Sequence, residues 1–290
     1  TEIYTLSLHD ALPISCKTES QFDNLRLLDF IRSSKIPAIA VGMGETGLIS
    51  RILGAKYGMP FTFCSLGGSE PTAPGQPTFD DCVNLYRVQS ISKTTPVYGV
   101  IGDPISHTKS PLMQNAALRA SGIDGVYLPF RVIGAPTEFI RAFREYPGLS
   151  LRGLSITIPH KVASISSADR LDPLAKRIGA INTLAFTADG ETLGANTDAY
   201  SAANGIEAAA GGPGALAGKR AVVLGAGGSA RAVAFALAEK NVVGCIANRT
   251  VERAKSLADE VGFEYFSLDA APEFKPEIVA NMTSVGIAPD

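Results

Sequence analysis

The chain has 290 residues, 46% of them apolar, and a formal net charge of -2 at pH 7. This length predicts two or three domains, each with its own hydrophobic core. A balanced charge without a basic block argues against nucleic acid and anionic membranes as partners, and no apolar run is long enough to span a membrane. The four cysteines fit neither a zinc site nor a disulfide framework, so we expect no metal and a cytoplasmic location.

Residues 1–15 lack an initiator Met, a basic segment and a clean apolar stretch, so they do not form a secretory signal. The string from Leu6 to Ser15 resembles the read-through of a sequencing adapter, and we therefore expect residues 1–15 to be non-native. At the other end, Asp290 follows a predicted strand and turn without a closing helix, which leads us to expect a truncated C-terminus.

Residues 16–87 alternate between helical and strand patterns, which is typical of a parallel α/β fold. The expected elements are helix 23–32, strand 36–41, helix 48–57, strand 61–63 and helix 79–86. Polar side chains lie at the predicted strand ends of this segment, among them Arg51, Thr72 and Gln76.

A polar connector, residues 88–95, precedes a second α/β segment that we assign to residues 96–204. Its expected elements are strand 97–102, helix 112–120, strand 127–132, helix 137–144 and strand 153–159. Pro159 bars a helix before it, so Lys161 lies just past the end of a strand. Ligands of open α/β sheets bind at that edge, which makes Lys161 a candidate site residue.

The third segment, residues 205–290, starts near a soft linker at 208–214 and carries a strand, a glycine-rich turn and an alanine-rich helix. Its expected strands are 221–225, 243–248, 264–266 and 278–281. Glycines let such a turn approach a phosphate closely, and the N–H groups at a helix start attract the anion. The candidate phosphate-binding residues are Gly225, Ala226, Gly227, Gly228, Ser229 and Ala230. On its own, this string is also compatible with an ordinary strand-to-helix turn.

The second predicted strand of this segment ends at Asn248, Arg249 and Thr250, about twenty residues after the glycines. A dinucleotide fold reads the adenosine ribose at this place, where a carboxylate would accept from a free 2′-hydroxyl. Arg249, with Arg253 one helical turn on, instead suits a 2′-phosphate, so the sequence favours NADP over NAD. The alternative is that Arg249 is a solvated charge at the start of the next helix.

Residues 98–286 resemble shikimate dehydrogenase. The motifs that carry this resemblance are, in order, Gly-Asp-Pro-Ile, Ser-x-Thr-x-Pro-x-Lys, Gly-Ala-x-Asn-Thr, Asn-Thr-Asp, the glycine-rich turn, Asn-Arg-Thr and Asn-x-Thr-Ser-Val-Gly. The resemblance implies an enzyme that reduces 3-dehydroshikimate to shikimate with NADPH. It also implies that Lys161 and Asp198 are the catalytic pair, because an ammonium can polarise a carbonyl and supply a proton while a carboxylate fixes its position.

The same resemblance implies the residues that contact the ligands. Substrate contacts fall on Thr108, Ser110, Thr157, Asn182 and Thr197, and further cofactor contacts on Thr283 and Ser284. The family usually has Ser where this chain has Thr108. Because the added methyl group narrows the substrate pocket, a dehydrogenase that prefers quinate to shikimate is a further alternative. A second alternative is that the chain is a non-catalytic NADP-binding remnant. Lys161 and Asp198 could also form an ordinary surface ion pair without a catalytic role.

Residues 16–87 resemble the C-terminal third of type I 3-dehydroquinate dehydratase, a (β/α)8 barrel. The resemblance implies that Arg51 binds the substrate carboxylate, which a guanidinium grips with two hydrogen bonds, and that Thr72 and Gln76 contact the substrate. Loop capping is the alternative for Thr72 and Gln76. The Schiff-base lysine of that family corresponds to a position near Pro13, so we expect no dehydratase activity.

A dehydratase barrel ahead of a shikimate dehydrogenase is the arrangement of the bifunctional family. The expected fold class is therefore α/β: a partial (β/α)8 barrel remnant, then an α/β substrate-binding domain and a Rossmann-like NADP-binding domain. Strand edges without partners should leave the remnant open and poorly protected from proteolysis.

Overall fold

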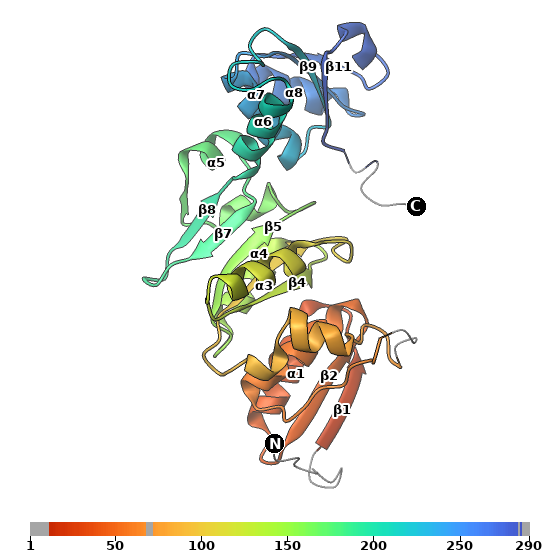
Figure 1. Ribbon diagram of the computed structural model, residues 1–290, viewed down its shortest axis with the longest axis vertical. Coiled ribbons are helices and arrows are strands. Elements are labelled where there is room, and N and C mark those ends of the chain that lie inside the picture. The colour runs from red at the N-terminus through yellow and green to blue at the C-terminus, as the bar shows by residue number, and fades with distance from the viewer. Residues whose placement is uncertain (1–11, 68–71, 284, 286–290) are drawn as a thin grey trace. The chain divides into compact units, whose positions relative to one another are not determined.

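The computed structural model describes residues 12–67, 72–283 and 285 (Figure 1). The chain divides into two compact units, residues 1–157 and 158–290, and both contain helices packed on strands. The expected α/β fold class is therefore confirmed. None of the described helices is long and apolar enough to cross a lipid bilayer.

The first unit starts with a two-stranded parallel sheet and continues into three further parallel strands, β3, β4 and β5. Its strands and α-helices are β1 (Leu12–Lys17), α1 (Gln21–Ser33), β2 (Ala38–Met43), α2 (Leu48–Leu53), β3 (Val97–Gly102), α3 (Ser110–Ala120), β4 (Val126–Arg131), α4 (Pro136–Glu145) and β5 (Leu151–Ile156). A π-helical turn (Asp81–Leu85) and 3-10 turns at 45–47, 54–57 and 88–90 join them.

The beginning of this unit differs from the sequence prediction in three places. Residues 12–15 belong to β1, which pairs with β2 from Leu12 opposite Ala38, although we had set these residues aside as non-native. Every side chain of β1 is at least partly exposed, so backbone pairing rather than a buried face defines the strand. Residues 61–63 form no strand, and the rings of Phe61 and Phe63 pack edge-to-face on each other with their centroids 5.5 Å apart. The predicted helix 48–57 changes to a 3-10 turn at Gly54.

The connector at 88–95 is held by a buried lysine. Lys56 is only 2% exposed, and its Nζ donates to the carbonyl oxygens of Lys93 and Thr95, both at 2.7 Å. Tyr57 also donates to the carbonyl of Pro147 at 3.2 Å. These contacts tie the first strands to the part of the unit that follows, while the poor protection expected of this segment stays a prediction.

The second sheet of this unit has the order β4-β3-β5, with β3 in the centre and all strands parallel. Helix α4 covers it through Phe139 and Phe143, whose rings lie 5.3 Å and 5.5 Å from that of Phe130 on β4. A side chain at Gly99 would strike the Phe130 ring at 2.3 Å, so the central strand needs glycine at this point.

The second unit contains a small sheet followed by a nucleotide-binding type of sheet. The elements are β6 (Arg170–Leu171), α5 (Pro173–Ile178), β7 (Thr183–Phe186), β8 (Thr192–Ala195), α6 (Asp198–Ala209), β9 (Arg220–Leu224), α7 (Gly228–Glu239), β10 (Val243–Ala247), α8 (Val251–Val261), β11 (Glu264–Phe266) and β12 (Ile278–Asn281), with 3-10 turns at 163–167 and 271–274. The domain border expected at 204/205 falls inside α6, which also takes up the first residues of the expected linker.

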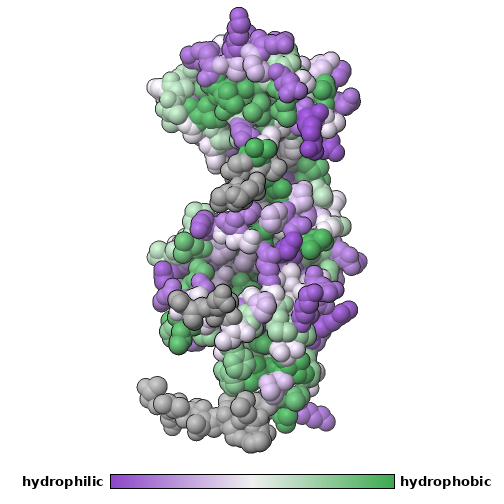
Figure 2. Space-filling view, turned by 90° about the vertical axis from the view of Figure 1, so that its right-hand side faces the viewer, coloured by the Kyte–Doolittle hydropathy of each residue, from purple (hydrophilic) through white to green (hydrophobic). Residues whose placement is uncertain are grey.

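Four parallel strands in the order β11-β10-β9-β12 form the nucleotide-binding sheet, and all four expected strands are present. Helix α7 buries seven of its twelve residues and, together with β9 and α8, forms an extended apolar cluster in this unit. Exposed apolar side chains lie on the two outer strands, at Tyr265 of β11 and Val279 of β12, and at Val243, where the inner strand β10 begins. Apolar side chains also gather at the surface of this part, at the top of Figure 2.

Candidate active site

The centre of the site is an ion pair between Lys161 and Asp198 in the second unit. The Nζ of Lys161 lies 2.6 Å from Oδ2 of Asp198, and the two side chains are 12% and 31% exposed. Asp198 is the first residue of α6, and Asn196 accepts from its backbone N–H at 3.1 Å. The pair predicted from the motifs thus forms in a position that is shielded but still open to a ligand.

A loop between α5 and β7 fixes both members of this pair. The backbone N–H of Ile181 donates to the carbonyl of Lys161 at 2.9 Å. The amide of Asn182 donates to Oδ1 of Asp198 at 2.7 Å and to the hydroxyl of Thr197 at 2.8 Å. One hydrogen-bonded cluster therefore contains Asn182, Thr197 and Asp198, which lie at most sixteen residues apart in the sequence.

The glycine-rich turn lies directly against this cluster. A methyl group at Gly228 would lie 2.7 Å from the Cβ of Lys161 and 3.5 Å from that of Ala180, so only glycine leaves room for the lysine. The Nζ of Lys161 also donates to the hydroxyl of Ser229 at 2.8 Å. The lysine therefore lies between a carboxylate and the start of α7.

The turn itself suits a phosphate group. Gly225 has a φ of +108°, and a side chain there would meet the carbonyl of Met282 at 3.0 Å. Gly227 caps α7, and a methyl group built on it meets no heavy atom within 4 Å. The twelve-residue helix directs its first N–H groups toward this open space, and its dipole favours an anion there.

The other cofactor candidates follow β10 and β12. Asn248 donates to the carbonyl of Thr250 at 2.9 Å, which shapes the loop before α8. Arg249 is exposed and makes no ion pair within the described part of the chain, and Arg253 lies in the first turn of α8. Thr283 donates to Asn281 at 2.7 Å after β12, whereas Ser284 lies outside the described residues.

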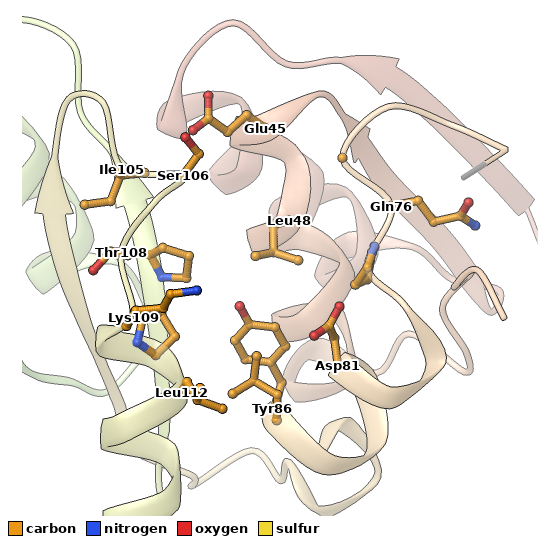
Figure 3. A pocket seen from close by; sticks show the side chains of 15 residues that line it. Glu45, Leu48, Gln76, Asp81, Tyr86, Ile105, Ser106, Thr108, Lys109 and Leu112 are labelled. Atoms are coloured by element: carbon orange, nitrogen blue, oxygen red, sulfur yellow. The ribbon is translucent and has the colours of Figure 1, made fainter. Parts of the chain in front are cut away.

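Three of the predicted substrate residues belong to the first unit. Thr157 follows β5, and the hydroxyl of Thr108 donates to that of Ser110, the first residue of α3, at 3.1 Å. A pocket of about 470 Å³ lies beside this loop, lined among others by Glu45, Asp81, Tyr86, Lys109 and Leu112. In Figure 3 the amine of Lys109 points into this pocket, while the hydroxyl of Thr108 is turned away from it. The hydroxyl of Thr108, which is bonded to that of Ser110, therefore lies on the face of the loop opposite to the pocket.

A second pocket of the first unit, of about 350 Å³, brings together Arg51, Thr72 and Gln76. Arg51 is 2% exposed, its Nε donates to the carbonyl of Gly42 at 2.9 Å, and burial lowers the pKa of its guanidinium. Thr72 donates to the side chain of Gln76 at 2.9 Å, which is the loop-capping contact named as the alternative. Pro13 also lines this pocket, and no lysine or histidine of the described residues does.

Two contacts of the site could not be found from the motifs. Ser229 and Gly228 were expected to touch only a cofactor, yet both contact Lys161. Their sequence separation from Lys161 is large, and nothing in the local pattern of either segment indicates the pairing. Among the described residues, no group of three or more His, Cys, Asp or Glu side chains could bind a metal ion.

Three protein-family models match the chain. Residues 7–93 match type I 3-dehydroquinase, residues 100–184 the shikimate dehydrogenase substrate binding domain, and residues 207–284 shikimate / quinate 5-dehydrogenase. The first match includes residues 7–15, so the resemblance begins earlier than we had assigned it.

Individual relatives give the same picture. The bifunctional 3-dehydroquinate dehydratase/shikimate dehydrogenase of Arabidopsis thaliana, named chloroplastic, is 39% identical over 97% of this chain and 48% of its own length. The shikimate dehydrogenase (NADP(+)) of Shouchella clausii is 37% identical over 68% of this chain and 72% of its own. The crystal structure of a shikimate dehydrogenase from Aquifex aeolicus superimposes with a TM-score of 0.62 at 35% identity, covering 69% of this chain and 73% of that one. The chain thus spans about half the length of the bifunctional relative.

Proposed function

This chain belongs to the shikimate dehydrogenase family, and on that premise we propose that it reduces 3-dehydroshikimate to shikimate with NADPH. The observation that carries the proposal is the Lys161–Asp198 pair, which lies against the start of α7. A hydride donor that places its pyrophosphate on that helix start would bring its reactive end near an amine able to donate a proton. The NADP(+) in the name of the Shouchella clausii relative supports this choice of cofactor.

Each group of residues in the site has a separate role in the proposed reaction. When bound, NADPH supplies the hydride to the carbonyl carbon of the substrate. Lys161 donates a proton from Nζ to the carbonyl oxygen, which becomes a hydroxyl, and the neutral amine regains its proton from water. Asp198 holds that amine at 2.6 Å, and Asn182 keeps the carboxylate turned toward it. Gly225, Gly227 and Gly228 leave room for the pyrophosphate beside the first N–H groups of α7.

The substrate is a small acid with several hydroxyls. Hydroxyl and amide side chains suit it because each can donate and accept hydrogen bonds. Thr108, Ser110, Thr157, Asn182 and Thr197 are proposed to bind it. The four cysteines are free, which fits a reducing cytosol as the proposed location.

The test is a two-step titration. NADPH is added first and binding is followed by fluorescence; 3-dehydroshikimate is then added and the loss of NADPH absorbance is recorded. Turnover that depends on both compounds is the expected result. Binding of NADPH without turnover would contradict the proposal and favour a non-catalytic NADP-binding protein.

Quinate is the second candidate substrate, because Thr108 adds a methyl group where the family usually has serine. The hydroxyl of Thr108 is bonded to Ser110, so the methyl group must take up other space beside the pair. The measurement is the ratio of kcat/KM for oxidation of shikimate and of quinate with NADP+. A ratio well above one supports shikimate, and a ratio below one identifies a quinate-preferring enzyme.

We further propose that the pocket of about 350 Å³ beside β1 and β2 does not support the dehydratase reaction in this chain. Pro13 lines the pocket of Arg51 and Gln76, and proline has no amine that could form a Schiff base. In the same assay, 3-dehydroquinate is therefore expected to give no NADPH oxidation unless a separate dehydratase is added.

The preference for NADPH gives a mutational prediction. Arg249→Gln is expected to raise the Kd for NADPH by about 10- to 100-fold, the cost of about one charge-assisted hydrogen bond, and to leave that for NADH nearly unchanged. Lys255→Gln is the matched control, because Lys255 is an exposed cation of α8 that pairs with Asp259 instead. Equal losses for NADPH and NADH in the Arg249 variant would show that this arginine does not read the 2′-phosphate.

A further inference from the structure

Arg231 connects its own helix, α7, with two other elements of the second unit, α5 and α8. It lies on the first turns of α7, and its Nη1 and Nη2 donate to the two carboxylate oxygens of Glu260 on α8, at 2.8 Å and 2.6 Å. Its Nε donates to the carbonyl of Ile178, the last residue of α5. The guanidinium plane also lies 5.8 Å from the ring centroid of Phe235. The planar guanidinium presents two parallel N–H donors to one carboxylate while its Nε donates to a third acceptor, a fixed geometry that a lysine ammonium does not offer.

The carbonyl of Ile178 is the point where α5 passes into the loop of the site. The last carbonyls of a helix lack partners within the helix, and here an arginine supplies one. Gly179 follows with a φ of +69°, and a side chain there would meet Nη2 of Arg231 at 3.3 Å. Arg231 therefore contacts the loop at its first residue.

From that residue the loop leads directly to the catalytic pair. Ala180 accepts from Asn196 at 2.9 Å, and Ile181 donates to the carbonyl of Lys161 at 2.9 Å. Asn182 then holds Asp198 at 2.7 Å. The three residues after Gly179 thus fix the backbone of Lys161 and the carboxylate of Asp198.

We propose that Arg231 is a positioning residue that fastens the loop Gly179–Asn182 to the cofactor-binding helix α7, so that Lys161 and Asp198 stay in register with a cofactor bound on that helix. The effect on catalysis rests on the proposed function, whereas the attachment of the loop to α7 does not. The hydrogen bond from Arg231 also lowers the pKa of Glu260, so the carboxylate keeps its charge further into the acidic range than an ordinary glutamate. Arg231 itself contacts neither substrate nor cofactor in this account.

The chain provides a matched control. Arg177 lies on α5 and pairs with Glu239 on α7 at 2.6 Å, and its guanidinium lies 5.9 Å from the same Phe235 ring. It therefore joins the same two helices, but its side chain is 59% exposed, and its hydrogen bond within the described part of the chain goes to Glu239 and not to the Ile178 carbonyl. Arg231→Met and Arg177→Met remove equal charge and keep an unbranched side chain that favours a helix.

The experiment compares these two variants in the full chain. Amide hydrogen exchange of residues 179–183 is expected to become about fivefold faster or more in Arg231→Met and to stay unchanged in Arg177→Met. In turnover assays, Arg231→Met should lower kcat about tenfold while the Kd for NADPH stays within about threefold, since misplacement of reacting groups affects the chemical step.

Unchanged exchange of the loop in Arg231→Met would overturn the inference, and so would an unchanged kcat in an active enzyme. Parallel losses in kcat, NADPH affinity and melting temperature would also overturn it, because they would describe a general loss of structure. Faster exchange confined to the loop in a chain that never turns over would instead contradict the proposed function and leave the fastening role of Arg231 supported.

Discussion

Lys161→Ala is expected to lower kcat for 3-dehydroshikimate by about two to four orders of magnitude, the usual contribution of a general acid. The amine that donates to Asp198 at 2.6 Å is lost, and no other described side chain replaces it in that place. The phosphate-binding turn remains, so the Kd for NADPH should change little. Steady-state kinetics and a fluorescence titration measure the two quantities.

Lys219→Ala is the control for this variant. Lys219 also pairs with a carboxylate, Glu277, but on the surface of the same unit, where an ion pair contributes at most about 1 kcal/mol to stability. It should keep the turnover of the parent chain. If Lys161→Ala loses NADPH binding together with turnover, Lys161 supports the structure rather than the chemistry.

Gly228→Ala is expected to lower kcat by about 10- to 100-fold, because displacement of a catalytic group by about 1 Å has an effect of that size. The added methyl group would lie 2.7 Å from the Cβ of Lys161, close to the main chain, so the lysine can avoid it only if its backbone moves. Crystal structures of the variant and the parent would show the shift, and kinetics at saturating NADPH would show its consequence.

Gly227→Ala separates this effect from a loss of cofactor binding. A methyl group at Gly227 meets no heavy atom within 4 Å of the chain itself, but it would occupy the space proposed for the pyrophosphate. This variant should raise the Kd for NADPH and keep kcat once the cofactor is saturating. If both variants affect only the Kd, the contact between Gly228 and Lys161 has no catalytic importance.

Local patterns predicted most of the elements that position the site. The apolar run at 221–225 and the glycines after it became β9 and the start of α7, because turn chemistry and helix formation are short-range properties. Lys161 and Asp198 were found because motifs place them just after strands. Their contact at 2.6 Å follows from the fold, while their catalytic role stays a prediction.

Other features depend on contacts between segments that are distant in the sequence, so no local sequence pattern indicates them. The strand β1 has an exposed side-chain pattern and exists through its pairing with β2. The roles of Ser229 and Arg231 require α7 to lie beside the loop at 179–182, which only the tertiary structure reveals. The domain border that we placed at 204/205 lies inside α6, and the glycine- and alanine-rich string at 208–214, which we interpreted as a linker, begins in the last turn of that helix.

The most direct test of the account is a crystal structure of this chain with NADP+ and shikimate bound together. We predict that the hydroxyl to be oxidised lies within hydrogen-bond distance of Nζ of Lys161, with the pyrophosphate on the N–H groups that follow Gly227. Shikimate bound away from Lys161 and Asp198, or a pyrophosphate bound away from α7, would contradict it.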